Sequence, residues 1–169
     1  MTDTNVEHVE CLIIGSGPAG LAAAQQLNRA GHLVTVFERD DALGGLLRYG
    51  IPNFKLEKEV IERRIAILKE EGIEFKTNVN VGVNYPVEKL DDFDAVVLCG
   101  GATLCRELPA KGSEIKGVVQ AMTFLKQQNK RNAAISLEVN HRGEPYTNKD
   151  ISAAGKHVVI IGGGDTGSD

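Results

Sequence analysis

Two glycine-rich turns are the residues of this chain whose spacing most clearly suggests chemistry, because each could bind a phosphate group. The first turn spans residues 15–20 (Gly-Ser-Gly-Pro-Ala-Gly) and follows an apolar run at residues 9–14. The second spans residues 162–167 (Gly-Gly-Gly-Asp-Thr-Gly) and follows an apolar run at residues 158–161. Each pattern predicts a strand, a tight turn and the start of a helix, whose free backbone amides can hold a phosphate. Two such turns predict two dinucleotide sites, with electrons passing between them.

An acidic residue follows the first turn at the spacing that a dinucleotide site requires. Residues 33–37 form a short apolar run, and Glu38 comes directly after it, 18 residues beyond Gly20. In a β-α-β dinucleotide-binding unit the acid at this place accepts hydrogen bonds from ribose hydroxyls. Because a carboxylate repels a 2′-phosphate, Glu38 predicts FAD or NAD at this site rather than NADP. The alternatives are that Glu38 is a solvated strand end and that Arg39 beside it is exposed rather than stacked on an adenine.

A glycine pair lies a few residues beyond this acid, in the stretch Leu-Gly-Gly-Leu-Leu at residues 43–47. A flavin dinucleotide is longer than the β-α-β unit and needs backbone close to its ribityl chain and ring. Glycine permits such a close approach because it has no Cβ atom. Gly44 and Gly45 therefore favour FAD over NAD, with an ordinary loop glycine pair as the alternative.

Apolar periodicity predicts the elements that must position these turns. We expect strands at residues 9–14, 33–37, 73–75, 79–81 and 95–98, the last one buried, and a further strand at residues 158–161. We expect helices at residues 18–30, 55–71 and 117–128, the second with an inward face of Leu56, Val60, Ile61, Ile65 and Leu68. Gly31 should end the first helix, and a right-handed crossover should make the first two strands parallel neighbours. Residues 40–54 should form a loop.

These elements predict an α/β fold with a Rossmann-like FAD-binding domain of the type found in flavoproteins with two dinucleotide-binding domains. We expect a disordered or variable N-terminus at residues 1–8 and the FAD-binding domain at residues 9–128. Residues 129–155 should connect it, with a short regular stretch at residues 135–139, to the start of a second Rossmann domain at residues 156–169. Because the chain stops at Asp169, inside the helix that the second turn opens, we expect it to be part of a longer enzyme.

A longer stretch resembles a known family. Residues 45–56 (Gly-Leu-Leu-Arg-Tyr-Gly-Ile-Pro-Asn-Phe-Lys-Leu), followed by Glu-Arg-Arg at residues 62–64, resemble the small (β) subunit of bacterial glutamate synthase. Residues 162–169 resemble the start of the NADPH site of the same family. The resemblance covers nearly all of residues 9–169, and its Gly-Ile-Pro-x-Phe-Lys-Leu stretch is far more specific than either glycine turn.

The resemblance implies roles for individual residues. Those expected to contact FAD are Gly15, Ser16, Gly17, Pro18, Ala19, Gly20, Glu38, Arg39, Gly44, Gly45 and Leu46. Lys55, which without the family would be a solvated lysine at a helix start, is implied as a cation near the flavin, and the backbone of Val81 is implied near the adenine. Residues 99–103 resemble the family's Thr-Gly-Ala turn, which places Gly101 and Ala102 near the cofactor, although Gly100 stands where threonine is usual and lacks its hydroxyl. The residues implied for NADPH are Gly162, Gly164, Asp165, Thr166 and Gly167.

The reaction that the family implies is transfer of a hydride from NADPH to FAD. Electrons then pass singly through iron–sulfur clusters to a large (α) subunit, which makes glutamate from 2-oxoglutarate and glutamine. No side chain in this chain is predicted to act as a general acid, a base, a nucleophile or a metal ligand. We expect the cysteine-rich iron–sulfur module and a later segment that completes the flavin site to lie outside these residues. The 169-residue chain alone should therefore lack turnover and real nicotinamide affinity.

Three other functions are alternatives to this one. A relative such as a dihydropyrimidine dehydrogenase or a ferredoxin–NADP reductase would share the plan of two nucleotide sites. A non-catalytic module could bind FAD, NAD or only an adenine nucleotide at the first turn. A thiol-disulfide reductase is disfavoured because Cys11, Cys99 and Cys105 form no Cys-x-x-Cys pair. We expect these cysteines to be reduced, with Cys11 and Cys99 buried.

Charge and hydropathy exclude other classes of partner. The net charge of −4 argues against a nucleic-acid surface, and Lys126, Lys130 and Arg131 are expected at the solvated end of a helix. No apolar run approaches the roughly 20 residues that span a bilayer. The polar N-terminus lacks the apolar segment of a signal peptide, so we expect a cytoplasmic protein.

Overall fold

A computed structural model describes residues 8–133 and 151–168 of this chain. Two compact units are present: the first is made by the described parts of Met1–Arg48 and Leu56–Gly101, and the second by those of Tyr49–Lys55 and Ala102–Asp169. The predicted domain boundaries near residues 128 and 155 stay a prediction. Nearly all of the expected variable N-terminus and the whole stretch at residues 135–139 lie outside the described residues.

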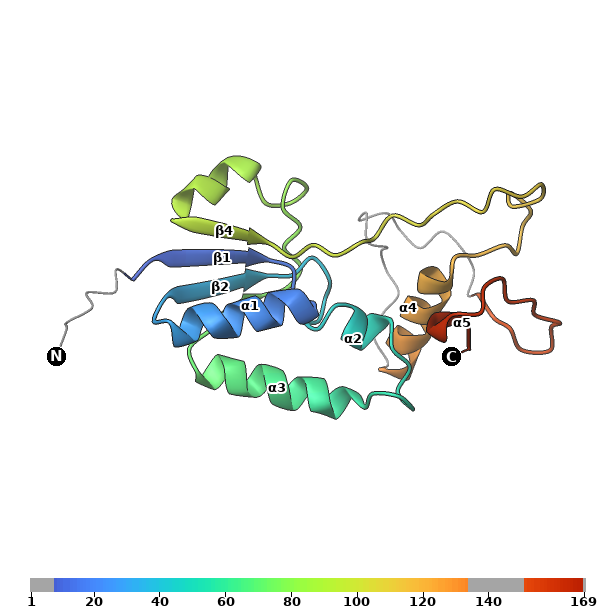
Figure 1. Ribbon diagram of the computed structural model, residues 1–169, viewed down its shortest axis with the longest axis horizontal. Helices are drawn as coiled ribbons and strands as arrows, with labels where there is room; N and C mark the ends of the chain where they lie inside the picture. Colours follow the sequence, from blue (N-terminus) through green and yellow to red (C-terminus); the bar gives the residue numbers. More distant parts are fainter. Residues whose placement is uncertain (1–7, 134–150, 169) are drawn as a thin grey trace. The chain divides into compact units, whose positions relative to one another are not determined.

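The first unit is built on a parallel sheet of four strands in the order β3-β2-β1-β4. Figure 1 labels three of them, β2, β1 and β4. The strands are β1 (Glu10–Ile14), β2 (Leu33–Phe37), β3 (Glu74–Lys76) and β4 (Ala95–Leu98). The pairs β1–β2, β1–β4 and β2–β3 are all parallel, and Leu12 lies opposite both Thr35 and Val96. The α/β class and the parallel pairing of the first two strands are therefore confirmed. The carboxyl ends of these strands lie at one edge of the sheet, as parallel pairing requires.

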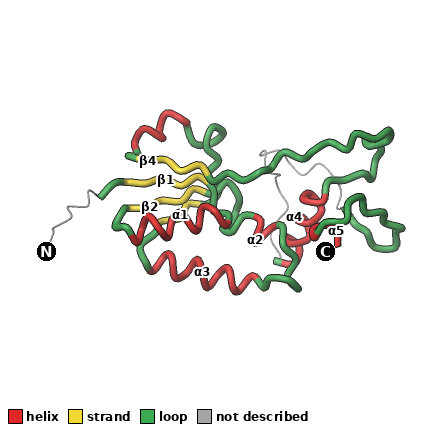
Figure 2. Tube along the Cα trace, viewed as in Figure 1, coloured by secondary structure: helices red, strands yellow, loops and turns green. Residues whose placement is uncertain are grey.

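Two helices of the first unit build the core with this sheet. Helix α1 (Pro18–Arg29) connects β1 to β2, and α3 (Lys58–Glu70) precedes β3. Figure 2 shows these helices in red and the strands in yellow. Gly31 follows α1 with a φ of +95°, as expected for the glycine that ends a helix. The core cluster draws on α1, α3 and the strands: its buried members are Cys11, Ile13, Leu21, Ala24, Val34, Val36, Leu68 and Ile73.

The boundaries of α3 and β3 differ from the prediction. Helix α3 begins at Lys58 instead of residue 55, because Glu57 has an extended backbone with a ψ of 135° and serves as the N-cap. Val60, predicted to face inward, is 45% exposed, whereas Ile61, Ile65 and Leu68 are buried. Strand β3 starts one residue later than predicted.

Two of the predicted strands differ from the structure, one in its existence and one in its burial. Residues 79–81 do not form a strand; they contribute only an isolated bridge between Val81 and Tyr85. Strand β4 has the predicted range but is not buried: Leu98 is 78% exposed. Within the described residues β4 pairs with β1 alone. Cys99 is correspondingly only half-buried, while Cys11 is buried as predicted.

Short helices connect the main elements of the fold. The loop predicted at residues 40–54 contains α2 (Leu46–Tyr49). A 3₁₀ helix, Val87–Asp92, precedes β4.

The second unit contains α4 (Ala121–Asn132) and α5 (Asp165–Ser168). Helix α4 begins and ends four residues later than predicted. Asn129 donates from Nδ2 to the carbonyl oxygen of Tyr49 at 3.2 Å, and the ammonium groups of Lys126 and Lys130 lie 5.2 and 5.5 Å from the centre of the Tyr49 ring. Lys130 is only 5% exposed, so the prediction that it lies at a solvated helix end is wrong.

Residues 158–161 are not a strand, although their apolar pattern predicted one. A strand needs a neighbour to satisfy its backbone, and these residues have no partner strand among those described. Their side chains are exposed, Val159 by 86%.

A search of the described residues found no helix with the length and apolar character needed to cross a membrane.

Replacing Leu68 with alanine tests the core assignment. Leu68 is 0% exposed on α3, so Leu68→Ala should lower the free energy of unfolding by about 2–5 kcal/mol. Its neighbour Ile67 is 41% exposed, and Ile67→Ala should cost clearly less. Urea denaturation followed by circular dichroism measures both, and equal losses would contradict the orientation of α3.

The three free thiols should differ in reactivity. Burial raises the pKa of the Cys11 thiol, and the charge of Asp94 raises it further. Because the thiolate is the reactive form, Cys11 should react with iodoacetamide much more slowly than the exposed Cys105 at neutral pH. Mass spectrometry of the alkylated peptides gives the order, and early modification of Cys11 in the folded protein would contradict it.

Candidate dinucleotide-binding site

The first glycine turn leaves β1 at the middle of the sheet edge. Gly15 has a φ of +108°, and its N–H donates to the carbonyl oxygen of Phe37 at 2.8 Å. A Cβ atom on Gly15 would lie 2.3 Å from the carbonyl oxygen of Cys99, and one on Gly20 would lie 1.9 Å from that of Gly15. Both positions therefore exclude a side chain. The tight turn predicted at Gly15 and the close helix packing predicted at Gly20 are confirmed.

Gly17 differs from these two glycines because the space around it is open. A Cβ atom there would meet nothing within 4 Å. Gly17 is the N-cap of α1, Pro18 is its first residue, and the carbonyl oxygen of Gly17 accepts the N–H of Leu21 at 3.0 Å. The free amides at the start of this 12-residue helix favour a negatively charged group. A diphosphate can thus approach the backbone at Gly17.

The carboxylate of Glu38 lies against the same turn. Its Oε2 atom accepts hydrogen bonds from both the N–H, at 3.0 Å, and the hydroxyl of Ser16. Its Oε1 atom accepts the N–H of Asp40 at 2.8 Å. Glu38 is 5% exposed, so the alternative of a solvated strand end is wrong. The acid and the phosphate turn form one hydrogen-bonded structure.

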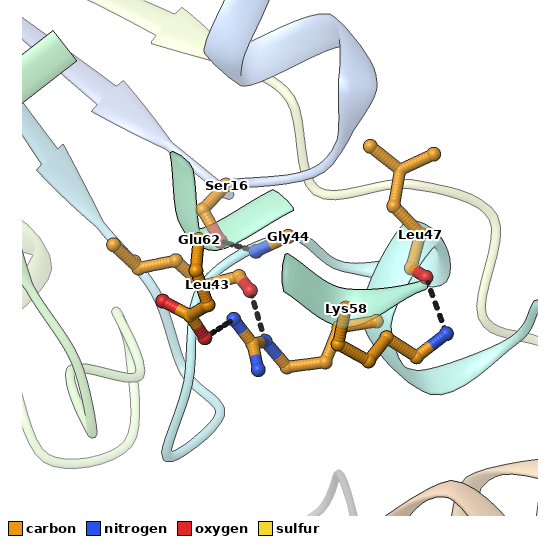
Figure 3. A network of polar contacts seen from close by, with 7 residues as sticks. Ser16, Leu43, Gly44, Leu47, Lys58 and Glu62 are labelled. Atoms are coloured by element: carbon orange, nitrogen blue, oxygen red, sulfur yellow. Dashed lines mark hydrogen bonds and ion pairs between the residues drawn. The ribbon is translucent and has the colours of Figure 1, made fainter. Parts of the chain in front are cut away.

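The glycine pair lies against the first turn, where Gly44 contacts Ser16 (Figure 3). The N–H of Gly44 donates to the hydroxyl oxygen of Ser16 at 3.0 Å. A Cβ atom on Gly45 would lie 2.8 Å from the Cα atom of Gly17, so these backbones are in direct contact. Sequence reasoning linked the pair to the same cofactor; the structure brings the pair, Glu38 and the turn together.

A cationic network supports the glycine pair. Arg48 donates from Nε to the carbonyl oxygen of Leu43 and forms an ion pair with Glu62 of α3. Lys58 donates from Nζ to the carbonyl oxygen of Leu47 at 3.1 Å (Figure 3). Burial lowers the pKa of Lys58, and the positive charge of Arg48 lowers it further. Sequence reasoning missed this network, because Arg48 lies on α2 and Glu62 on α3, and periodicity relates only residues within one element.

The remaining predicted contacts at the first site stay predictions. Arg39 and Val81 are half-buried in the first unit, and Leu46 is 55% exposed at the start of α2. Gly101 is exposed, with a φ of +72°. Lys55 and Ala102 belong to the second unit.

The second glycine turn repeats the local geometry of the first. Gly162 has a φ of +120°, and a Cβ atom on Gly167 would lie 2.6 Å from the carbonyl oxygen of Gly162, which matches the relation of Gly20 to Gly15. Gly164 has open space around it, as Gly17 does. Asp165 and Thr166 begin α5, as predicted, but this helix has only four residues. The turn is formed, whereas its strand is not.

Within residues 8–133 and 151–168, no group of three or more His, Cys, Asp or Glu side chains could hold a metal ion.

Comparison with known proteins identifies the family of this chain. The family model described as pyridine nucleotide-disulphide oxidoreductase matches residues 9–169. The chain belongs to this family. Among solved structures it is similar to Mycobacterium tuberculosis FprA in complex with NADPH, with a TM-score of 0.67 and 26% identity over 78% of this chain and 32% of that one. This similarity agrees with the parallel sheet and the glycine turn.

Curated relatives carry a more specific name. The chain is 59% identical to the glutamate synthase [NADPH] small chain of Mycobacterium tuberculosis (strain ATCC 25618 / H37Rv), over 93% of this chain and 31% of the relative. It is 52% identical to the protein of the same name from Bacillus subtilis (strain 168), over 93% of this chain and 30% of the relative. The predicted resemblance to the glutamate synthase small subunit is confirmed. The chain spans about a third of the length of these relatives.

Alanine substitutions at two glycines of the first turn should lower stability by different amounts. Gly20→Ala places a methyl group against the backbone of Gly15, so it should lower the free energy of unfolding by about 1–3 kcal/mol or more. Gly17→Ala meets open space and should cost less than about 1 kcal/mol. Urea denaturation compares the two variants, and equal stability would show that α1 does not pack on the turn as described.

Proposed function

We propose that this chain is the FAD-binding part of a glutamate synthase small subunit. One observation carries the assignment to this site: Ser16 links the Glu38 carboxylate and the glycine pair to the turn at which α1 begins. This arrangement supports a ligand that has a ribose, a diphosphate and a further extension past the glycines. The names of the curated relatives support the reaction.

The residues present fit FAD at the first turn. The amides at the start of α1 would hold the diphosphate, and Gly17 leaves room for it. Glu38 would accept a ribose hydroxyl and would repel a 2′-phosphate, which disfavours NADP at this place. The backbone at Gly44 and Gly45 would lie along the extension toward the flavin, as the contact between Gly45 and Gly17 supports.

The reaction follows from the chemistry that FAD supplies when bound, namely acceptance of a hydride and release of single electrons. In the proposed enzyme NADPH delivers the hydride, and iron–sulfur clusters pass the electrons to a large (α) subunit that makes glutamate. The part of this chain is to bind and orient: helix α1 holds phosphates, and the buried carboxylate of Glu38 selects the sugar. Lys55, as a cation near the flavin ring, would favour negative charge on it.

The second turn would serve the NADPH site of the same enzyme. Its glycines have the geometry of the first turn, which supports a phosphate-binding role. We also propose that the protein is cytoplasmic.

Flavin titration of the purified chain tests the proposal. We expect FAD to bind and to colour the protein yellow, and we expect Gly17→Ala to weaken binding at least tenfold because its methyl group occupies the approach of the diphosphate. Gly164→Ala is the matched control, since it adds the same group at the equivalent place of the second turn and should leave FAD affinity unchanged. Quenching of flavin fluorescence gives both dissociation constants.

The same titration separates the proposal from a non-catalytic module. Binding of ADP without preference for FAD would favour a module that holds only an adenine nucleotide. Equal loss of FAD affinity in Gly17→Ala and Gly164→Ala would contradict the assignment of FAD to the first turn.

A further inference from the structure

Ser16 contacts both Glu38 and the glycine pair of the first site and is itself buried. It is 0% exposed. Its N–H, at 3.0 Å, and its hydroxyl both donate to Oε2 of Glu38, and the same hydroxyl oxygen accepts the N–H of Gly44 at 3.0 Å. Its backbone amide and its side chain are thus both engaged within the protein.

Donors of this chain occupy most of the acceptor positions of the Glu38 carboxylate. An ionised carboxylate offers about four acceptor positions. Three are taken by donors of the chain, two from Ser16 at Oε2 and one from Asp40 at Oε1. One position remains, on Oε1, so the carboxylate cannot turn without breaking bonds to Ser16. A single ribose hydroxyl can therefore be accepted without displacing a donor of the chain.

The hydroxyl of Ser16 also links the Glu38 carboxylate to the glycine pair through two hydrogen bonds. This hydroxyl donates its hydrogen to Glu38 and accepts the N–H of Gly44. These two bonds use its only donor and one of its two acceptor positions. Alanine at residue 16 would leave the Gly44 N–H without this acceptor and Glu38 with one donor fewer. Both groups lie in a buried place, where an unpaired polar group is costly.

We propose that Ser16 is a positioning residue for ribose recognition: it fixes the Glu38 carboxylate so that one acceptor position faces the ribose, and it holds the glycine pair in register with that acid. This inference rests on the proposed function, since it assumes that an adenosine ribose binds beside Glu38. Ser16, which the family resemblance implied as an FAD contact, thus acts through Glu38 in this proposal and does not touch the cofactor.

The test compares ligands with and without ribose hydroxyls. Affinities of ADP and of 2′,3′-dideoxy-ADP are measured by calorimetry for the wild-type chain and for Ser16→Ala, and their ratio reports how well the hydroxyls are recognised. We expect the wild type to prefer ADP and Ser16→Ala to lose about fivefold of that preference, the factor that one hydrogen bond is worth. Glu38→Gln gives the ratio that remains when the charged acceptor is absent.

Two further variants separate positioning from a general loss of structure. Ser16→Cys keeps a side chain of similar size with a weaker donor and acceptor, so its ratio should lie between those of wild type and Ser16→Ala. Thr35→Val removes a hydroxyl from β2 that has no role in holding Glu38 and should leave the ratio unchanged. Circular dichroism of each variant confirms that it is folded.

The outcomes distinguish this inference from the proposed function. A wild-type ratio near one, or no binding of ADP and FAD, would overturn the proposed site and the inference with it. A wild type that prefers ADP, with folded Ser16→Ala and Ser16→Cys variants that keep the full preference, would overturn the inference alone. Loss of affinity for both ligands by the same factor would show that Ser16 is only structural.

Discussion

The contact between the start of α1 and the turn before it is the constraint on which the rest of the first site depends. Gly20 packs so closely on the carbonyl oxygen of Gly15 that neither residue can carry a side chain, and Gly15 in turn lies against the backbone of Cys99. Strand β1, helix α1 and the chain leaving β4 therefore meet at one point. Because β2 and β4 flank β1 on opposite sides, this point is where the order of the strands reverses. Open α/β sheets bind ligands at such a place.

The two glycine turns show which part of this geometry is local. Gly162 and Gly167 repeat the relation of Gly15 and Gly20, although residues 158–161 form no strand. The left-handed backbone of the first glycine and the missing side chain of the last one suffice to form the turn. A strand, by contrast, needs a neighbour for its hydrogen bonds, and residues 158–161 have none among the described residues. The turn is thus a local property, while the sheet edge that makes it a ligand site is not.

The same distinction explains which features could be predicted from the sequence. The range of β2 and the start of α1 follow from apolar runs, a Pro at the first helical position and a glycine after the last turn, which are all local signals. The start of α3 was placed three residues early because apolar period alone does not show that Glu57 is extended. The burial of Lys130 and the exposure of Leu98 depend on what lies beside them, and no periodicity gives that.

The local sequence predicts the position of Glu38 but not the groups that surround it. Spacing placed an acid at the end of β2, but the donors that hold it come from Ser16 and Asp40, and the first of these lies 22 residues away. A buried carboxylate must be satisfied by hydrogen bonds, and each bond from the protein removes a position that a ligand could use. Fewer acceptor positions of Glu38 are therefore left for a ligand, while its carboxylate is held in one orientation. An acid held in this way stabilises the empty turn. In the proposed site it would also limit the sugar to one direct hydrogen bond, so that binding at the turn and stability of the turn would depend on the same carboxylate.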